Sequence, residues 1–367
     1  MKITKVEAIP FHIPFDPDFH LKFAYRTSGA ADHVLIRIHT DDGLVGIAEA
    51  PARPEIYGET QKSIVALIDQ YLGPYLMGKD PLLLEEINAL LDRIPYNYCA
   101  KSGVDIALHD LLGKSLNLPV YKVLGGKSRD RVSLSWMVGI NSPENMAREC
   151  ERFMGRGIQA FKIKAGVDFA EDRQRFLAIR KAVGEKALLY IDANQGFKSL
   201  KKTVAFLKEL EAHGLAFVEE PFPVRNRKDR REAARLLSVP IMGDESCFTP
   251  WDVAQELELG ALGIVLVKVA RTGFFKTRKI IHLCQLAGIS CMIGSQGDSS
   301  IGAAASLHAG VAFSNILFPA EVSYHLRMEG ELLKDPPEFK DGELTVPERP
   351  GLGIEIDEKA LKKFRVV

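Results

Sequence analysis

The stretch "AFKIKAG", residues 160–166, decides the fold because charged side chains alternate in it with apolar ones. Successive side chains of a β-strand point to opposite faces, so Phe161 and Ile163 share one face while Lys162 and Lys164 share the other. Two ammonium groups on one face of a buried strand are costly unless something there needs them. The pattern therefore predicts a strand that leads into a functional site.

Seven further short apolar segments follow the same plan after residue 126, and amphipathic helical segments separate them, several closing at glycine. The residues at their ends recur every 24 to 28 positions, close to the roughly 30 residues of a β/α unit in a barrel. We therefore expect an α/β protein with a modified (β/α) TIM-like barrel over residues 126–328 and functional groups at the carboxyl ends of its strands. These end residues are Trp136, Lys164, Asp192, Glu219, Asp244, Lys268, Gly294 and Glu321.

The flanking regions lack this alternation. Residues 1–125 begin with strand-like segments joined at an Asp42-Gly43 turn and continue with helical periodicity, which predicts an α+β domain. The tail, residues 329–367, is rich in proline and glycine, and we expect it to pack back on that domain.

Composition excludes several classes of protein. Lysine plus arginine and aspartate plus glutamate both number 48, so no net basic charge would attract nucleic acid or an anionic membrane. No segment has the apolar length of a signal peptide core or a membrane span. Five cysteines without a C-x-x-C pair are typical of a reducing compartment. We therefore expect a cytoplasmic protein.

Three carboxylates end three consecutive predicted strands: Asp192, Glu219 and Asp244. Converging on one rim, they would repel one another and raise each other's pKa values unless a cation lay between them. An all-oxygen site favours Mg²⁺ over Zn²⁺, with Mn²⁺ as a possible substitute, and no zinc motif is present. The alternative is that each acid caps the helix that follows its strand.

Lys164 and Lys268 end the second and sixth predicted strands, on opposite sides of an eight-strand ring. A lysine near a divalent cation or a second lysine can serve as a neutral base. Removal of a proton next to a carboxylate forms an enediolate, which a cation stabilises. The alternatives are ion-paired rim lysines, a Schiff-base lysine, or a non-catalytic relative. A dinucleotide-binding oxidoreductase is excluded because no G-x-G-x-x-G follows a strand.

The motifs "KIKAG", "IDANQG", "VEEP", "GDES" and "KVARTG", in this order, resemble the muconate-lactonizing-enzyme subgroup of the enolase superfamily. The resemblance implies a capping domain built from the N-terminal segment and the tail, a homo-oligomer, and a small-molecule carboxylate substrate. It also implies roles for particular residues: Asp192, Glu219 and Asp244 as magnesium ligands, Lys164 and Lys268 as the acid/base pair, Lys162 as the partner of the substrate carboxylate, Asn194 and Glu245 beside these groups, and Phe23, Tyr25, Arg53 and Tyr57 as specificity residues of the capping loops.

The end of the eighth segment bears on the activity within the subgroup. It reads Ala320-Glu321-Val322-Ser323 and lacks the Asp-x-Asp of the family's dipeptide epimerases, which favours a muconate cycloisomerase. Gln296 and Asp298 of the seventh segment are more polar than a cycloisomerase pocket is expected to be, although Asp298 also suits a helix cap. A racemase or epimerase of an amino acid derivative, or a lyase or dehydratase with the same half-reaction, therefore remains the alternative.

Overall fold

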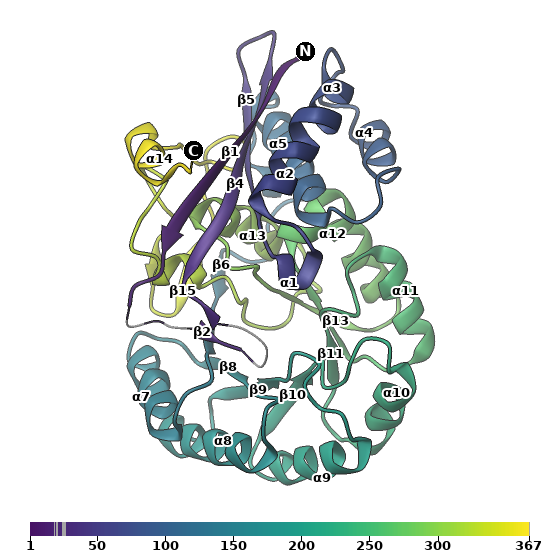
Figure 1. Ribbon diagram of the computed structural model, residues 1–367, viewed down its shortest axis with the longest axis vertical. Coiled ribbons are helices and arrows are strands. Elements are labelled where there is room, and N and C mark those ends of the chain that lie inside the picture. Colours follow the sequence, from purple (N-terminus) through teal and green to yellow (C-terminus); the bar gives the residue numbers. More distant parts are fainter. Residues whose placement is uncertain (18, 20, 24–26, 367) are drawn as a thin grey trace.

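The computed structural model describes residues 1–17, 19, 21–23 and 27–366, and its capping domain lies across one end of a barrel (Figure 1). Three antiparallel strands form the sheet of the capping domain, in the order β1-β4-β5. Gly43, at φ +86°, lies in the turn between β4 and β5, as the Asp42-Gly43 pair predicts. The strands are β1 (Ile3–Pro14), β4 (Ala30–Thr40) and β5 (Val45–Pro51), and a small hairpin adds β2 (Leu21–Lys22) and β3 (Thr27–Ser28).

Helices follow this sheet in the chain, and the longest of them, α5, joins the two domains. Most of the side chains of α5 are buried, since it packs against β4 and β5 on one side and against barrel helix α12 on another. The helices of this region are α1 (Pro54–Tyr57), α2 (Gln61–Leu67), the π-helical turn η1 (Ile68–Leu72), α3 (Gly73–Leu76), α4 (Leu84–Leu91), α5 (Tyr98–Ser115) and α6 (Val120–Val123).

The barrel contains a parallel sheet of seven strands in chain order, with helices around its outside (Figure 1). Its strands are β7 (Ser135–Val138), β8 (Ala160–Lys164), β9 (Leu188–Asp192), β10 (Leu215–Glu219), β11 (Ile241–Gly243), β12 (Ile264–Val267) and β13 (Ser290–Ile293). Its helices are α7 (Pro143–Met154), α8 (Phe169–Val183), α9 (Leu200–Glu211), α10 (Arg227–Leu236), α11 (Pro250–Leu259), α12 (Val269–Leu286) and α13 (Ser300–Ala312).

The eighth predicted strand is present as an irregular segment, residues 315–321, which corrects the expectation of eight regular strands. Single bridges join Ile316 to Cys291 and Ala320 to Leu134, so the segment connects β13 to the first strand and closes the barrel. Pro319 lies inside the segment and has no N–H to donate, which prevents a continuous ladder there.

The inside of the barrel is divided into an apolar layer and a polar layer. The register pairs Lys162 with Tyr190 and Lys164 with Asp192, so these side chains share the inner face of the sheet. The inward side chains nearer the amino ends of the strands form a separate buried apolar cluster: Tyr190, Phe217, Met242, Ile264, Leu266 and Met292. The polar groups therefore rest on a packed floor.

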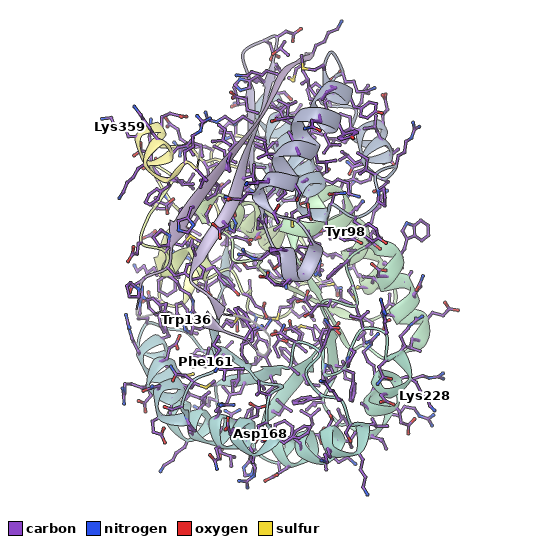
Figure 2. The ribbon with its side chains drawn as sticks, viewed as in Figure 1. Tyr98, Trp136, Phe161, Asp168, Lys228 and Lys359 are labelled. Carbon is purple, nitrogen blue, oxygen red and sulfur yellow. The ribbon has the colours of Figure 1, made fainter. Side chains whose placement is uncertain are left out.

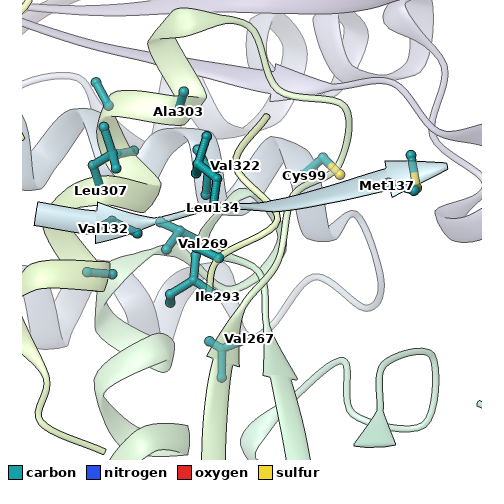
Figure 3. Close-up of a cluster of buried hydrophobic side chains, with 14 of the residues drawn as sticks. Cys99, Val132, Leu134, Met137, Val267, Val269, Ile293, Ala303, Leu307 and Val322 are labelled. Atoms are coloured by element: carbon teal, nitrogen blue, oxygen red, sulfur yellow. The ribbon is translucent and has the colours of Figure 1, made fainter. Parts of the chain in front are cut away.

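A larger apolar core is continuous between the two domains. Figure 3 shows part of it, with Val132, Val267 and Leu307 from the barrel region and Cys99 of α5 among the buried side chains of the same cluster. This continuity holds the capping domain against the barrel.

The tail runs past the barrel and returns to the capping domain. Its first strands pair with a short strand ahead of the barrel, and its helix α14 then packs on β1. Val366 N donates to Pro10 O of β1 at 2.9 Å. These elements are β6 (Arg131–Ser133), the 3₁₀ turn η2 (Tyr324–Arg327), β14 (Phe339–Lys340), β15 (Glu343–Thr345) and α14 (Glu358–Phe364). None of the helices in the described part of the chain has the length and apolar character needed to cross a membrane.

Candidate active site

Lys164 is the last residue of β8, and its side chain is buried against barrel groups. Its Nζ donates to Asp192 Oδ2 and, at 2.9 Å, to Asn194 Oδ1. The ring of Phe23 covers the ammonium group, with 4.7 Å between Nζ and the ring centroid. The structure therefore brings the predicted lysine, the predicted carboxylate and the predicted neighbouring amide together.

Lys162 lies one step deeper on the same face and contacts three carboxylates. Its Nζ is 3.0 Å from Asp192 Oδ2, 2.7 Å from Glu219 Oε2 and 3.0 Å from Glu321 Oε1. Tyr190 OH, from the apolar layer, also donates to Glu321 at 2.9 Å. Lys162 thus compensates charge at the junction of the two layers.

Lys268 lies between β12 and α12, on the far side of β9, β10 and β11 from Lys164. Its Nζ donates to Asp244 Oδ2 at 2.5 Å, and Arg271 Nη1 donates to the other oxygen, Oδ1, at 2.7 Å. Each of the two lysines is therefore paired with a different predicted metal ligand.

The turn that carries Lys268 depends on a kink in α12 and on support from the capping domain. Gly273 has φ +60°, inside an otherwise helical segment, and a Cβ there would lie 2.3 Å from Asp105 Oδ2 of α5. The same Asp105 oxygen accepts from Phe275 N at 3.1 Å, and Ser102 Oγ donates to Ala270 O. Only glycine has both the conformation and the small size for this position.

Backbone conformation also shapes the loops after β9 and β10. Asn194, Gln195 and Glu220 have positive φ values of 41°, 66° and 35°, which is uncommon for residues other than glycine and is found at functional sites. Asn194 Nδ2 donates to Glu245 Oε1 at 3.3 Å, so the two predicted neighbours of the site contact each other. Glu220 Oε1 accepts from Asp244 N at 2.9 Å and thereby fixes the loop that presents that ligand.

Burial and charge shift several pKa values in this cluster. Burial lowers the pKa of Lys164, and the Lys162 ammonium adds to the effect, while Asp192 opposes it. Burial also opposes the charge of Lys268, but Asp244 outweighs it and the pKa is raised. Burial, followed by repulsion from neighbouring carboxylates, raises the pKa of Glu219 well above its usual range and that of Glu245 to about 8. The cluster holds more negative charge than its own cations compensate.

A hard divalent cation fits this donor set. The three predicted ligands offer only carboxylate oxygens, the chemistry that Mg²⁺ prefers. Among the described residues, no group donates a hydrogen bond to the buried Glu245 Oε2, and Glu219 Oε2 has only the ion-pair contact with Lys162, without hydrogen-bond geometry. Ammonium groups lie between the carboxylates, and among the described residues no three aspartate, glutamate, histidine or cysteine side chains are arranged as a ready-made metal site.

The predicted residues of the seventh segment contact protein groups. Gln296 Nε2 donates to the hydroxyl of Tyr57, so this pair connects the barrel to the capping loop. Asp298 Oδ1 accepts from Gln296 N at 3.0 Å. Arg53 is buried, and a Cβ on Gly297 would lie 2.0 Å from its Nη2, so Arg53 crosses directly over that turn. Tyr25 lies outside the described residues.

Trp136 does not lie among the site residues, contrary to the expectation for the end of the first barrel strand. It pairs with Phe161 in the register and therefore points to the outer face of the sheet, where the two lie close together in Figure 2. Its indole Nε1 donates to Glu149 of α7 at 2.7 Å and its ring stacks on Phe153. Strand alternation places Trp136 with the core because the inward positions of β7 are Ser135 and Met137.

Arg271, Glu220 and Tyr190 were not among the predicted site residues. Arg271 was within the quoted motif "KVARTG", three positions after Lys268, and this spacing on one helical face is the signal that could have identified it. Glu220 directly follows a predicted ligand, and Tyr190 lies two positions before another, on the same strand face.

A cavity of about 810 Å³ adjoins the cluster between the capping domain and the barrel. Asn194 and Glu245 form part of its wall, so it lies beside the amide that accepts from Lys164. The capping domain contributes aromatic side chains to it, including Tyr57 and Tyr98, and the barrel contributes Phe248.

Two family models match the chain. Residues 145–360 match the model described as enolase C-terminal domain-like, and residues 6–125 match the N-terminal domain model of mandelate racemase / muconate lactonizing enzyme. The chain belongs to the enolase superfamily. Its place in the superfamily is the muconate-lactonizing-enzyme subgroup, as the motifs predict.

The similar proteins include more than one kind of isomerase. This enolase-superfamily chain is 31% identical over 372 residues to N-succinyl-L-Arg/Lys racemase of Bacillus cereus, covering 100% of this chain and 98% of the relative. The structure of a muconate lactonizing enzyme from Mucobacterium Smegmatis, complexed with muconolactone, has a TM-score of 0.96 and 39% identity, with 100% of both chains covered. A dipeptide epimerase from Enterococcus faecalis V583, complexed with Mg and the dipeptide L-Leu-L-Tyr, has a TM-score of 0.91 and 30% identity, covering 97% and 100%.

Proposed function

We propose that this chain is an isomerase that transfers a proton to or from the α-carbon of a small carboxylate substrate. The observation that carries the proposal is the pairing of Lys164 with Asp192 and of Lys268 with Asp244 on opposite sides of β10. A lysine is thereby available on each face of any substrate held over the three carboxylates. A proton-transfer reaction at carbon requires such a base beside compensating positive charge.

Asp192, Glu219 and Asp244 would hold a divalent cation, with Mg²⁺ as the ion of choice and Mn²⁺ as a substitute. The Mg in the similar dipeptide epimerase supports this choice. When bound, the cation supplies a Lewis acid that stabilises negative charge developing on the substrate carboxylate. Lys162, buried among three carboxylates, keeps its proton and supplies fixed positive charge, because their combined effect on its pKa outweighs that of burial.

The proton itself moves at the Nζ atom of Lys164 or Lys268. A lowered pKa makes Lys164 the better base at neutral pH, and burial together with Lys162 lowers it. Burial of both ammonium groups, at 3% and 6% exposure, excludes bulk water from the reacting carbon.

Muconate cycloisomerization is the activity we favour. The 39% identity to a muconate lactonizing enzyme over the whole chain supports it. The contacts of Gln296 and Asp298 with Tyr57 and the backbone also support it, because they remove the main objection, a pocket too polar for that substrate.

Racemization or epimerization of an amino acid derivative is the second candidate. It is favoured by the presence of two buried lysines rather than one, since inversion at carbon needs a proton donor opposite the base. The similar racemase and dipeptide epimerase add support. The cavity of about 810 Å³ beside Asn194 and Glu245 would leave room for the part of such a substrate distant from the reacting carbon.

A substrate screen in heavy water with Mg²⁺ tests both candidates. Muconates, N-acyl amino acids, dipeptides and proline derivatives would be incubated with the full chain, followed by mass spectrometry for deuterium and by chromatography for product. Lactone formed from a muconate supports cycloisomerization, and deuterium at the α-carbon of both enantiomers supports racemization. A screen that gave neither deuterium uptake nor turnover would refute proton transfer at the α-carbon.

A further inference from the structure

Arg271 is a buried cation beside the site that proton transfer does not use. It is 3% exposed and lies on the short first turn of α12, ahead of the kink at Gly273. Its guanidinium donates from Nη1 to Asp244 Oδ1 at 2.7 Å and from Nη2 to Leu266 O at 3.0 Å. It is therefore fixed at once to a ligand carboxylate and to the backbone of β12.

Arg271 makes Asp244 different from the other two predicted ligands. The side chains that pair with Asp192 and Glu219 are lysines, whereas Asp244 has a lysine on Oδ2 and a guanidinium on Oδ1. A lysine can release its proton during the reaction, but a guanidinium keeps its charge throughout. One oxygen of Asp244 thus faces a cation that can lose its charge, and the other faces a cation that cannot.

The other side of Arg271 faces the capping domain. Tyr57 of α1 lies beside the guanidinium and packs edge-on against Phe248 at 5.0 Å between ring centroids. Arg271 in turn lies over the face of Phe248 at 5.0 Å. Gln296 holds the Tyr57 hydroxyl from the barrel side. A continuous set of contacts therefore leads from the capping loop to Asp244.

We propose that Arg271 is a positioning residue that orients Asp244 for cation binding and conveys to it the position of capping residue Tyr57. By occupying Oδ1, the guanidinium leaves Oδ2 as the oxygen of Asp244 available to the cation and to Lys268. The inference rests on the proposed function in one respect, the binding of Mg²⁺ by the three carboxylates.

Isothermal titration of the full chain with Mg²⁺, without substrate, tests the inference. We expect Arg271→Met to raise the Kd for Mg²⁺ by about 10- to 100-fold, the usual cost of losing a partner of a metal ligand. Arg271→Lys should show a smaller rise in Kd, because lysine keeps the positive charge. A rise is still expected, because one ammonium group cannot bridge Asp244 and Leu266 O. The matched control is Arg327→Met, since Arg327 is also buried but is bound to Glu149 and to Met137 O; it should lower the melting temperature and leave the Kd unchanged.

The link to the capping domain has its own readout. Tyr57→Phe removes only the hydroxyl and should raise the Mg²⁺ Kd by about fivefold, the effect of one lost hydrogen bond. In the Arg271→Met background the same change should have no further effect, because the route to Asp244 is already broken. If Tyr57→Phe raised the Mg²⁺ Kd by the same factor in the wild type and in the Arg271→Met background, the coupling between the two residues would be overturned.

The outcomes separate this inference from the function on which it rests. Wild-type protein that binds no Mg²⁺ overturns both. Wild-type binding with an unchanged Kd in Arg271→Met and Arg271→Lys overturns the role of Arg271 alone. Should Arg271→Met fail to fold, Arg271→Lys decides, and a Kd equal to that of the wild type then counts against the proposal.

Discussion

The two predicted catalytic lysines occupy contrasting settings. Lys164 is the last residue of a regular barrel strand, and its partners Asp192 and Asn194 come from the next strand and its loop. Lys268 lies where β12 gives way to a kinked turn, and that turn is held by α5 of the capping domain. One half of the site is thus built by the sheet, and the other half requires the docking of two domains.

The two lysines differ in which part of the molecule fixes their position. Strand pairing positions Lys164 without help from the capping domain, although Phe23 covers its ammonium group. The backbone of Lys268 can shift whenever α5 or Gly273 shifts, so events in the capping domain reach this lysine first. The predictions below probe the two halves separately, beginning with the largest effect.

Loss of either lysine should have the largest effect on activity. We expect Lys164→Ala and Lys268→Ala each to lower kcat by about 10²- to 10⁴-fold, the contribution of general acid–base catalysis. In a racemase, each variant should still exchange the α-proton of one enantiomer, and proton NMR in heavy water would detect it. In a cycloisomerase, only one lysine is the base, so an arginine at the other position should retain part of the activity.

The control for these variants is Lys228→Ala, an exposed lysine on α10 that Figure 2 shows at the edge of the barrel. It should behave as wild type. Full activity in both Lys164→Ala and Lys268→Ala would contradict a catalytic role for the two lysines.

Removal of the divalent cation should abolish activity, whichever of the two lysines acts as the base. Dialysis against a chelator is expected to stop turnover, and Mg²⁺ should restore it, as a coupled assay would show. Asp192→Asn and Asp244→Asn should each weaken Mg²⁺ binding by more than the ~10- to 100-fold that follows loss of an outer partner. Asp168→Asn is the control, because Asp168 caps the N-terminus of α8 by accepting from Ala170 N and Glu171 N. Turnover unaffected by chelation would contradict the prediction.

Gly273→Ala should damage only the half of the site that depends on docking. Its φ of +60° and the close approach of Asp105 make any side chain unfavourable there. Gly260→Ala is the matched control, since Gly260 has φ +67° with no atom within 4 Å of the added Cβ. We expect a loss of about 1 kcal/mol in the free energy of unfolding for Gly260→Ala, and a larger loss with reduced kcat for Gly273→Ala. Denaturant unfolding and kinetics would measure both, and equal stabilities would show that Asp105 tolerates the Cβ.

The smallest effect is expected above Lys164. Phe23→Leu keeps an apolar side chain but removes the ring that lies 4.7 Å from the ammonium group. A cation–π contact of about 0.5–1 kcal/mol corresponds to a two- to fivefold change in kcat/KM. Phe169→Leu, which removes ring contacts with Phe197 and with Phe206 of α9, should leave kcat/KM unchanged. Equal kinetics for the two variants would show that the ring over Lys164 has no catalytic effect.

Strand alternation explains how much of this site could be predicted from sequence. The two lysines of β8 and the carboxylates of β9, β10 and β11 follow a repeat of strands and helices, and parallel strands bring their carboxyl ends to one rim. The same alternation explains the failure at Trp136, where the predicted strand end was one position out of phase with the inner face.

Other features depend on contacts that no local pattern reveals. The kink at Gly273 exists because α12 meets Asp105, which is 168 positions earlier in the chain. Gln296 follows its strand as a substrate-binding residue would, yet its partner is Tyr57. A polar side chain at a strand end has the same sequence signature whether it meets a ligand or another domain.

The irregular segment 315–321 makes the barrel unequal around its circumference. Bridges and a few backbone hydrogen bonds, such as Ser135 N to Ala320 O at 2.8 Å, join it to its neighbours where other strands have ladders. Amide hydrogens at this seam should exchange with solvent before those of β9 and β10, because fewer cooperative contacts must open together. Glu321, a partner of Lys162, lies on the seam. Local opening of the barrel would therefore begin beside the charged cluster and uncover it before the rest of the molecule unfolds.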